Sequence, residues 1–536
     1  MEKSLYQWQE ECLKRWLSKG ARGMVQAVTG SGKTYLAMCA VDALEEKLEQ
    51  KVFVKIVVPT SALMNQWAKA LREHLASKEE GESCGSAMGK MEAGRETSGN
   101  SIGLRGGGYK DPANRRYMIY VINSARYELA RQTLKQLENG EPVFLIADEC
   151  HHYARGENSL IFEFQDRISM EKAPWYSLGL SATLPWGQEG AALTKALGPR
   201  IYTYGMSKAA SLKTVSAVDI FHVSLSFREE ELENYEEISD EMLHCYTQLL
   251  RFMPTLGKMN LRERFEEIRR LSAGKDRTGR LARKYLNLTW QRRKLVCLAS
   301  DRIACAQELI RRLPQNEKIM IFGERIAQAE ELYQLLYREY PGRAGRCHSE
   351  MGEQANRNTL ERFRTGEFRI LVTCKSMDEG VNIPDASVGI ILSGTSVQRQ
   401  RTQRMGRVIR RTEGKERAAL YYLHVTESAE DDCYLPDTGD SRIFEIAFVS
   451  GRKNFSNPEY EDAAVQVIDD IRYSGADDNT LREVHRCLDI GRVRGDWRKA
   501  PEELARRIKE AAEVRERNYW VCMKRVEDKA EKKQRG

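Results

Sequence analysis

The sequence lacks the features that mark membrane-embedded and metal-clustered proteins. No run of 18 or more apolar residues occurs in the 536-residue chain, so we expect no helix that crosses a bilayer. Residues 1–8 lack the apolar core of a signal peptide. The twelve cysteines include no CxxC pair, which argues against a zinc or iron–sulfur site and favours reduced thiols. We therefore expect a cytoplasmic protein, or a nuclear one in a eukaryote.

A strong excess of charge of one sign is also missing. The chain has 85 Lys and Arg against 78 Asp and Glu, which gives a net charge of +7. This balance permits nucleic-acid binding without establishing it. The length predicts roughly two to four globular domains.

Two stretches of the chain alternate apolar, strand-like runs with helical segments, the pattern of an α/β domain with a parallel sheet. We expect the first domain over residues 1–205 and the second over residues 311–455. Strand signals vanish between them, so a linker and helical insertion are expected over 206–310, and 456–536 is expected to be helical. Residues 77–100, rich in Gly, Ser and Glu, are expected to form a mobile surface insertion.

A glycine-rich segment follows the predicted strand 23–27 and precedes the helical run 35–48. Its Gly30 and Gly32 allow backbone N–H groups to approach phosphate closely, Lys33 suits the β- and γ-phosphates, and Thr34 supplies a hydroxyl for magnesium. This combination predicts a nucleoside triphosphate site and favours ATP.

Two acidic residues, Asp148 and Glu149, follow the apolar strand 143–147. They therefore belong at the carboxyl end of that strand, the edge at which open α/β sheets bind ligands. We expect Asp148 to hold Mg²⁺ through water and Glu149 to position and deprotonate the attacking water.

Together these motifs, and others in the same order, resemble those of superfamily 2 helicases and translocases over residues 5–425. The resemblance implies two tandem RecA-like domains and nucleic-acid-dependent ATP hydrolysis. Residues 148–151 resemble the family's DECH box. The implied nucleotide contacts are Gln9, as the adenine-reading residue, with Thr29, Gly30, Ser31, Gly32, Lys33, Thr34 and Gly380. The implied coupling residues are Ser181, Thr183 and His151.

The resemblance extends to the second domain, where residues 403–410 are similar to the family's arginine motif. It implies catalytic roles for Gln403, Arg407 and Arg410, with the two arginines as candidate arginine fingers. An arginine supplied from a second domain stabilises charge on the transferred phosphoryl group, an effect worth roughly a thousandfold or more in rate. Closure of the two domains is thereby expected to depend on bound ATP.

Nucleic-acid contacts are carried over by resemblance to Pro59, Thr60, Ser124 and Thr373. The chain looks closest to the branch of type III restriction-enzyme motor subunits and the group B xeroderma pigmentosum helicase, which favours DNA over RNA. An RNA-dependent ATPase, and an ATP-driven clamp that recruits a partner without processive unwinding, are the alternatives.

Two further segments have two interpretations each. The basic stretch 277–294, with Tyr285 and Trp290, is either a nucleic-acid contact or a solvated helix face with two core aromatics. The charged tail 501–535 is either a docking segment for a protein partner, such as a separate nuclease or effector subunit, or a helix that packs on the second domain.

Overall fold

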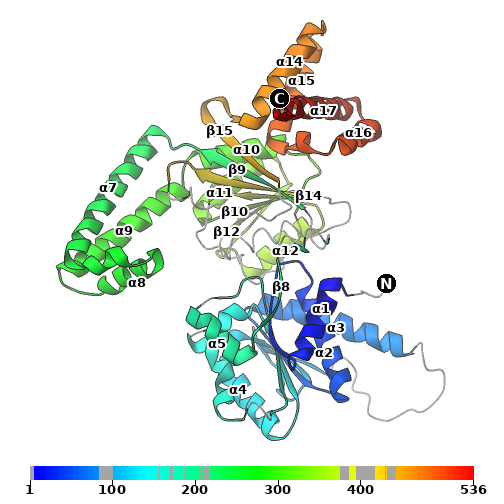
Figure 1. The fold of residues 1–536 in the computed structure, drawn as a ribbon, viewed down its shortest axis with the longest axis vertical. Helices are drawn as coiled ribbons and strands as arrows, with labels where there is room; N and C mark the ends of the chain where they lie inside the picture. The colour runs from blue at the N-terminus through cyan, green and yellow to red at the C-terminus, as the bar shows by residue number, and fades with distance from the viewer. Residues whose placement is uncertain are drawn as a thin grey trace.

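The structure is a computed structural model that shows two α/β domains one above the other, a helical arm beside the upper domain and a helical bundle beyond it (Figure 1). Its described residues are 5–83, 101–154, 156–169, 173–185, 187–205, 208–209, 212, 217–374, 386–393, 417–428, 430 and 442–535. Within them, no helix is both long and apolar enough to span a bilayer.

Domain 1, residues 5–205, is built on a sheet of strand order β4-β3-β5-β2-β6-β7-β1-β8. Every pair in this sheet is parallel except the short β3–β4 hairpin. The strands are β1 (Arg22–Ala27), β2 (Phe53–Val58), β3 (Ile102–Gly106), β4 (Tyr109–Lys110), β5 (Tyr117–Val121), β6 (Val143–Asp148), β7 (Trp175–Ser181) and β8 (Arg200–Tyr204). The helices are α1 (Gln7–Ser18), α2 (Lys33–Leu48), α3 (Ser61–Ser83), α4 (Ile122–Glu138) and α5 (Gly187–Leu197), with 3₁₀ segments at Cys150–Tyr153 and Gly156–Asp166.

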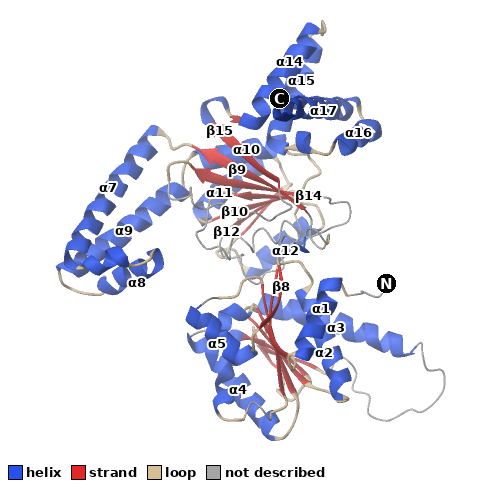
Figure 2. Ribbon diagram, in the orientation of Figure 1, coloured by secondary structure: helices blue, strands red, loops and turns tan. Residues whose placement is uncertain are grey.

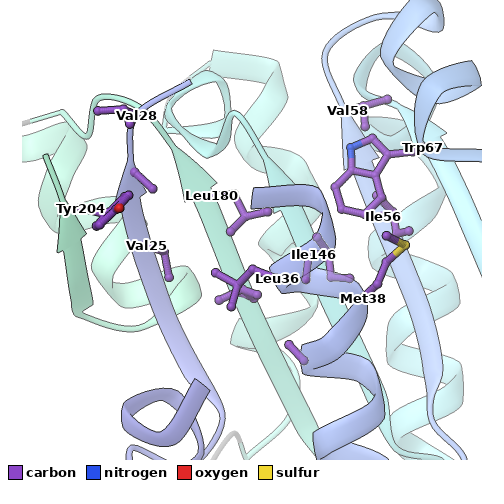
Figure 3. Close-up of a cluster of buried hydrophobic side chains, with 14 of the residues drawn as sticks. Val25, Val28, Leu36, Met38, Ile56, Val58, Trp67, Ile146, Leu180 and Tyr204 are labelled. Atoms are coloured by element: carbon purple, nitrogen blue, oxygen red, sulfur yellow. The ribbon is translucent and has the colours of Figure 1, made fainter. Parts of the chain in front are cut away.

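Helices cover both faces of this sheet, as the apolar character of its strands requires (Figure 2). All residues of β5 and β6 are buried. On one face Leu36 of α2 and Trp67 of α3 pack over Val25, Ile56 and other strand residues (Figure 3). On the other face α4 and α5 pack over a second cluster. The sheet is thus rigid, and its carboxyl edge carries the loops that follow β1, β2, β5, β6 and β7.

Domain 2 contains a second sheet of order β11-β12-β10-β13-β14-β9-β15-β16, in which only the β15–β16 pair is antiparallel. We use this name for β9 together with the elements from α10 to β16. The strands are β9 (Ala217–Leu225), β10 (Ile319–Gly323), β11 (Ala344–Cys347), β12 (Ile370–Cys374), β13 (Val388–Ile391), β14 (Arg417–Val425), β15 (Arg442–Val449) and β16 (Asn454–Ser456). The helices are α10 (Asp301–Arg312), α11 (Ile326–Glu339) and α12 (Glu353–Arg364).

Between β9 and α10 the chain forms the helical arm, residues 229–297. Its long helices α7 (Glu229–Phe252) and α9 (Arg277–Cys297) pack together, with α8 (Leu261–Leu271) at the tip (Figure 1). The C-terminal bundle, residues 458–535, consists of α14 (Pro458–Tyr473), α15 (Asp478–Arg494), α16 (Pro501–Glu510) and α17 (Val514–Arg535) around an apolar core of its own.

The predicted fold class, two tandem α/β domains with parallel sheets and flanking helices plus a helical insertion and a helical C-terminal region, is confirmed. The domain boundaries stay a prediction, and one element bears on them: β9 lies within the stretch 206–310 expected as linker and insertion, yet it is a strand of the second sheet. Of the expected mobile insertion 77–100, residues 77–83 continue helix α3, and residues 84–100 lie outside the described part of the chain.

Candidate active site

The predicted phosphate loop connects β1 to α2. Gly30 and Gly32 adopt positive φ angles of 82° and 91°, conformations that favour glycine. Gly32 precedes the first turn of α2, so the helix N-terminus points its N–H groups into the loop. The Lys33 ammonium donates to Ala27 O at 3.0 Å, and the Ser31 hydroxyl to Val28 O at 2.7 Å. These two hydrogen bonds hold the loop against the end of β1.

Gln9 of α1 lies directly against this loop. Its side-chain Nε2 donates to Gly32 O at 3.1 Å, and its Oε1 accepts from the Tyr6 backbone N–H at 2.8 Å. A Cβ at position 32 would come within 2.8 Å of Gln9 Nε2, so a substitution there would require the Gln9 side chain to shift, besides the strain of the positive φ. The structure thereby brings Gln9 to the phosphate loop, 23 residues further along the chain. Its adenine-reading role stays a prediction.

Asp148, the last residue of β6, is held by groups from three directions. The Trp67 indole Nε1 donates to Asp148 Oδ2 at 2.8 Å, and the Glu149 backbone N–H donates to Oδ1 at 3.0 Å. The Tyr153 hydroxyl donates to Asp148 O at 2.7 Å, which fixes the backbone of this residue. The sequence did not predict Trp67 or Tyr153 as site residues; a buried tryptophan beside an acidic strand end becomes visible only when the fold joins positions 67 and 148.

The carboxyl group of Asp148 is 7% exposed, and burial is the main reason that its pKa rises to about 6. The neighbouring Glu149 carboxylate raises the pKa further, while the Trp67 hydrogen bond and the Lys33 ammonium oppose the rise. Lys33 and Asp148 therefore share one electrostatic environment. A cation bound between the Asp148 carboxyl group and a phosphate would favour the ionised form of Asp148.

Glu149 has a left-handed backbone, with φ of 47°, which is uncommon for a residue with a side chain. Such strained residues concentrate at functional sites. Glu149 Oε2 lies 3.4 Å from His151 Nδ1 and 3.5 Å from Ser181 Oγ. His151 Nδ1 lies 2.7 Å from Ser181 Oγ, which donates to Thr183 O at 2.7 Å. The three expected coupling residues thus form one hydrogen-bonded chain that starts at Glu149.

The residues at this edge fit a magnesium–nucleotide complex. Mg²⁺ prefers oxygen ligands, and the half-buried Thr34 hydroxyl and the Asp148 carboxylate provide them. Thr29 Oγ1 is buried without a hydrogen-bond partner among the described residues, and a phosphate oxygen would satisfy it. Gly32 has no side chain, which allows the backbone of the loop to approach a ligand closely.

The nucleic-acid candidates of domain 1 also lie at the carboxyl edge. Pro59 and Thr60 follow β2, and Ser124 lies in the first turn of α4 after β5, the neighbouring strand. The β3–β4 hairpin lies close to Ser124 and to Ser61, the residue after Thr60. A Cβ on Gly106 would lie 2.9 Å from Ser124 Oγ, and one on Gly107 would lie 2.8 Å from Ser61 Cβ. The glycine-rich hairpin is therefore part of this surface. It was not predicted from the sequence.

Several predicted residues of domain 2 are not placed at the site by the structure. Gly380, Gln403, Arg407 and Arg410 lie outside the described residues. Thr373, at the end of β12, is 2% exposed and its hydroxyl donates to Ile321 O at 3.0 Å. A contact of that hydroxyl with nucleic acid would need a different arrangement, and its role stays a prediction.

Comparisons with known proteins match one family model within each α/β domain. Residues 2–185 match the family model for the type III restriction enzyme res subunit, and residues 301–412 match the helicase conserved C-terminal domain. A relative described as DNA 3'-5' translocase XPB2, from Sulfurisphaera tokodaii, is 27% identical over 431 residues, which cover 80% of this chain and 82% of the relative.

Solved structures with similar folds include a fragment of a putative HsdR subunit of a type I restriction enzyme from Vibrio vulnificus YJ016. That match covers 82% of this chain and 68% of the other, with a TM-score of 0.49 at 16% identity. The Hef helicase domain from Pyrococcus furiosus matches with a TM-score of 0.47 at 16% identity, over 78% of this chain and 95% of the other.

Proposed function

We propose that the chain, which is similar to type III restriction-enzyme res subunits and to an XPB2 translocase, is a superfamily 2 helicase or translocase that couples ATP hydrolysis to movement on DNA. One observation carries the catalytic part of the proposal. The loop after β1, the carboxylates at the end of β6 and the Ser181 hydroxyl at the end of β7 meet at one sheet edge, although up to 150 residues separate them in sequence.

The proposed chemistry assigns one task to each group. The Lys33 ammonium and the N–H groups of the loop would bind the phosphates. Thr34 and Asp148 would hold magnesium, which neutralises phosphate charge when bound. The Glu149 carboxylate would orient the attacking water and accept its proton. Arg407 and Arg410 would reach the transferred phosphoryl group from domain 2.

The chain from Glu149 through His151 and Ser181 to Thr183 supports a role in coupling. When the Glu149 carboxylate turns toward a water molecule at the γ-phosphate, it would lose its contacts with His151 and Ser181. The hydrogen bonds of Ser181 with His151 and Thr183 would then rearrange, because the Ser181 hydroxyl has a single proton to donate. We propose that this rearrangement passes the state of the nucleotide to the loop after β7.

DNA is the proposed track because the relative that spans most of the chain is described as a DNA translocase. An RNA-dependent ATPase and a clamp that recruits a partner remain as alternative outcomes. A separate nuclease or effector subunit is the proposed partner, with the C-terminal region as its docking site, and a cytoplasmic location is part of the same proposal.

The test is the steady-state ATPase rate without polymer and with single-stranded, double-stranded and forked DNA and the corresponding RNAs. We expect stimulation by a DNA form and loss of turnover in Lys33→Ala. Lys47→Ala, which changes a lysine at the other end of the same helix, serves as the matched control. Stimulation by RNA alone would overturn the choice of track, and a rate indifferent to every polymer would favour the clamp.

A second variant tests the role of Glu149. Glu149→Gln keeps the size of the side chain and removes the base, so turnover should fall at least about a hundredfold. ATP binding should persist, because the Gln side chain does not disturb the phosphate loop. Normal turnover in this variant would show that another group activates the water.

A further inference from the structure

The two long helices of the arm have opposite charge. Helix α7 contains eight acidic residues and one basic residue, whereas α9 contains seven basic residues and no acidic one. In Figure 1, α7 lies on the outer side of the arm and α9 on the side that faces the rest of the molecule. Polyanions are therefore repelled by the outer helix and attracted to the inner one.

The exposed face of α9 is uniform in chemistry. Every exposed residue between positions 280 and 294 is a cation, an amide or an aromatic, and their spacing of three or four places them along one side of the helix. They are Arg280, Arg283, Lys284, Asn287, Trp290, Gln291 and Lys294, which we call the α9 stripe. The stripe is about 21 Å long at 1.5 Å per residue.

The structure separates the two aromatic residues of this segment. Tyr285 packs into the apolar core of the arm, where its ring centre lies 6.1 Å from that of Tyr246. Trp290 is 60% exposed. A single exposed aromatic is ordinary on a protein surface. Trp290 differs because it stands in the middle of a row of cations and amides, the combination that binds unpaired nucleotides.

The middle of the stripe is also hollowed. A depression of about 440 Å³ is lined by residues of α7 and α9, with one acid against three cations. Its lining residues are Glu241, Arg280, Arg283, Lys284, Asn287, Leu288 and Gln291. Glu241 pairs with Lys284, so the hollow keeps an excess of positive charge, and Trp290 directly precedes its lining residue Gln291 in α9.

The base of α9 is fixed to domain 2. Arg293 lies 3.7 Å from the buried Glu324, and Gln328 Nε2 donates to Cys297 O at 2.9 Å. Arg302 Nε donates to Val296 O at 2.9 Å. Trp290 stands only two helical turns from these anchors, so a ligand bound to it would keep its position relative to the motor.

We propose that the α9 stripe is a second nucleic-acid site, at which Trp290 stacks on an unpaired base and the flanking cations bind the phosphates of that single strand. An indole can stack only on a base whose face is free, so the site selects a single strand over a closed duplex. The proposal rests on the proposed function, since it gives the motor a hold on a tail or displaced strand outside its nucleotide-binding domains.

The first test measures binding of a fluorescently labelled single-stranded oligonucleotide and of a blunt duplex by anisotropy. Stacking of one base predicts that Trp290→Ala weakens single-strand binding between about 5- and 150-fold. The preference for single strand over duplex should fall by the same factor. Trp290→Phe should retain most of this preference, because its ring can still stack on a base. Tyr473→Ala removes an aromatic that is 90% exposed on α14 and is the matched control.

The second test uses salt. Each phosphate contact on a single strand contributes about −0.7 to the slope of log K against log salt concentration. Arg280→Gln with Lys294→Gln should therefore reduce the slope by about 1.4. Lys51→Gln, at the opposite edge of domain 1 from the site, should leave the slope unchanged.

The outcomes separate the two proposals. If the wild type binds DNA and is stimulated by it, but Trp290→Ala binds single strand like the wild type, only the second site is wrong. Equal losses for single strand and duplex would also overturn it, because stacking would not explain them. If no nucleic acid binds the wild type or stimulates its ATPase, both proposals fail.

Discussion

At the scale of single residues, Trp67 shows how the site is preorganised. Its indole is 1% exposed and donates to Asp148 Oδ2, while the Glu149 backbone N–H donates to Oδ1. Both carboxylate oxygens therefore have fixed directions before a ligand arrives. Groups that orient a ligand residue in this way affect metal affinity or activity by roughly 10- to 100-fold.

We predict that Trp67→Phe lowers magnesium–nucleotide affinity or turnover by roughly 10- to 100-fold, because it removes the donor while keeping most of the apolar packing. Trp16→Phe is the control: Trp16 is also buried in domain 1 and its Nε1 donates to Ser177 O at 2.9 Å, away from the site. Isothermal titration and steady-state kinetics would measure both variants. Equal effects would mean that packing, rather than the hydrogen bond to Asp148, matters.

The raised pKa of Asp148, about 6, predicts a pH dependence of ligand binding. Metal ligands must be deprotonated, so affinity for magnesium–nucleotide should fall about fourfold between about pH 7.5 and about pH 5.5. Asp148→Asn should bind magnesium–nucleotide weakly at both pH values. The ratio of the wild-type affinity to the Asp148→Asn affinity at each pH corrects for titration of the nucleotide itself. An unchanged ratio over this range would contradict a protonation at Asp148.

The protonated form of Asp148 should also stabilise the folded protein. Its folded-state pKa lies above that of an unfolded aspartate, so this contribution is complete at low pH and is lost as the pH rises through about 6.

Contiguous motifs were the part of the site that the sequence could predict. Gly30, Gly32 and Lys33 lie within four residues, and their chemistry is legible without a fold. Trp67 contacts Asp148 across 81 residues, and Gln9 contacts Gly32 across 23. Gln9 was predicted only by resemblance. Trp67 was not predicted as a partner of Asp148, since no local pattern connects them.

At the scale of elements, the ends of several segments of domain 2 meet at one buried side chain. Arg302, in the first turn of α10, is fully buried. It donates to Val296 O at the end of α9, to Leu392 O after β13 and to Leu423 O in β14. Its guanidinium also pairs with the buried Glu430. The arm, two strands and the segment after β14 thus depend on one charge pair.

Removal of Arg302 should therefore destabilise domain 2. We predict that Arg302→Met lowers the free energy of unfolding by about 3–5 kcal/mol, because it leaves the Glu430 carboxylate buried without its cation. Adding Glu430→Gln should restore part of the loss. Arg364→Met, which breaks an exposed pair with Glu361, should change the free energy of unfolding far less than Arg302→Met, because solvent screens this pair. Urea unfolding would measure the series, and equal losses for the two arginines would contradict a special role for Arg302.

Strands were predicted correctly where the sequence has an unbroken run of apolar residues. Strands whose run is interrupted by polar residues were missed. β6 is fully buried, and its residues 143–147 were predicted as a strand. β8 has exposed residues at positions 200 and 203, and β15 alternates buried and exposed positions, so neither forms a continuous apolar run. β9 was missed although it is largely buried, because Asp219 and His222 interrupt its apolar run.

At the scale of the whole molecule, the C-terminal bundle packs on domain 2. The Tyr421 hydroxyl in β14 donates to Val493 O of α15 at 2.8 Å, and Arg312 of α10 lies 3.1 Å from Asp489. Gly495 approaches the Phe444 ring so closely that a Cβ would lie 2.5 Å from it. These contacts join α15, which precedes the charged tail 501–535, to domain 2. The two interpretations of the tail itself stay open.

We predict that a chain ending at residue 457 has a lower thermal midpoint for domain 2 than the full chain. The truncation uncovers Tyr421 and Phe444, which are both buried at present. A chain ending at residue 500, which keeps α14 and α15, should lose less. Differential scanning calorimetry would compare the three. If neither truncation changes the domain 2 transition, the bundle is a separate docking unit rather than part of the motor.

The position of β9 has a consequence for how the protein is made. This strand lies between β14 and β15, yet it leaves the ribosome about 190 residues before the first of them. At synthesis rates of about 5–20 residues per second, the interval lasts about 10–40 seconds. During that time an apolar strand has no neighbour to pair with, while domain 1 is already complete. The nascent chain therefore exposes an unpaired, apolar strand while residues 226–416 are synthesised. Chaperones protect segments of this kind from aggregation.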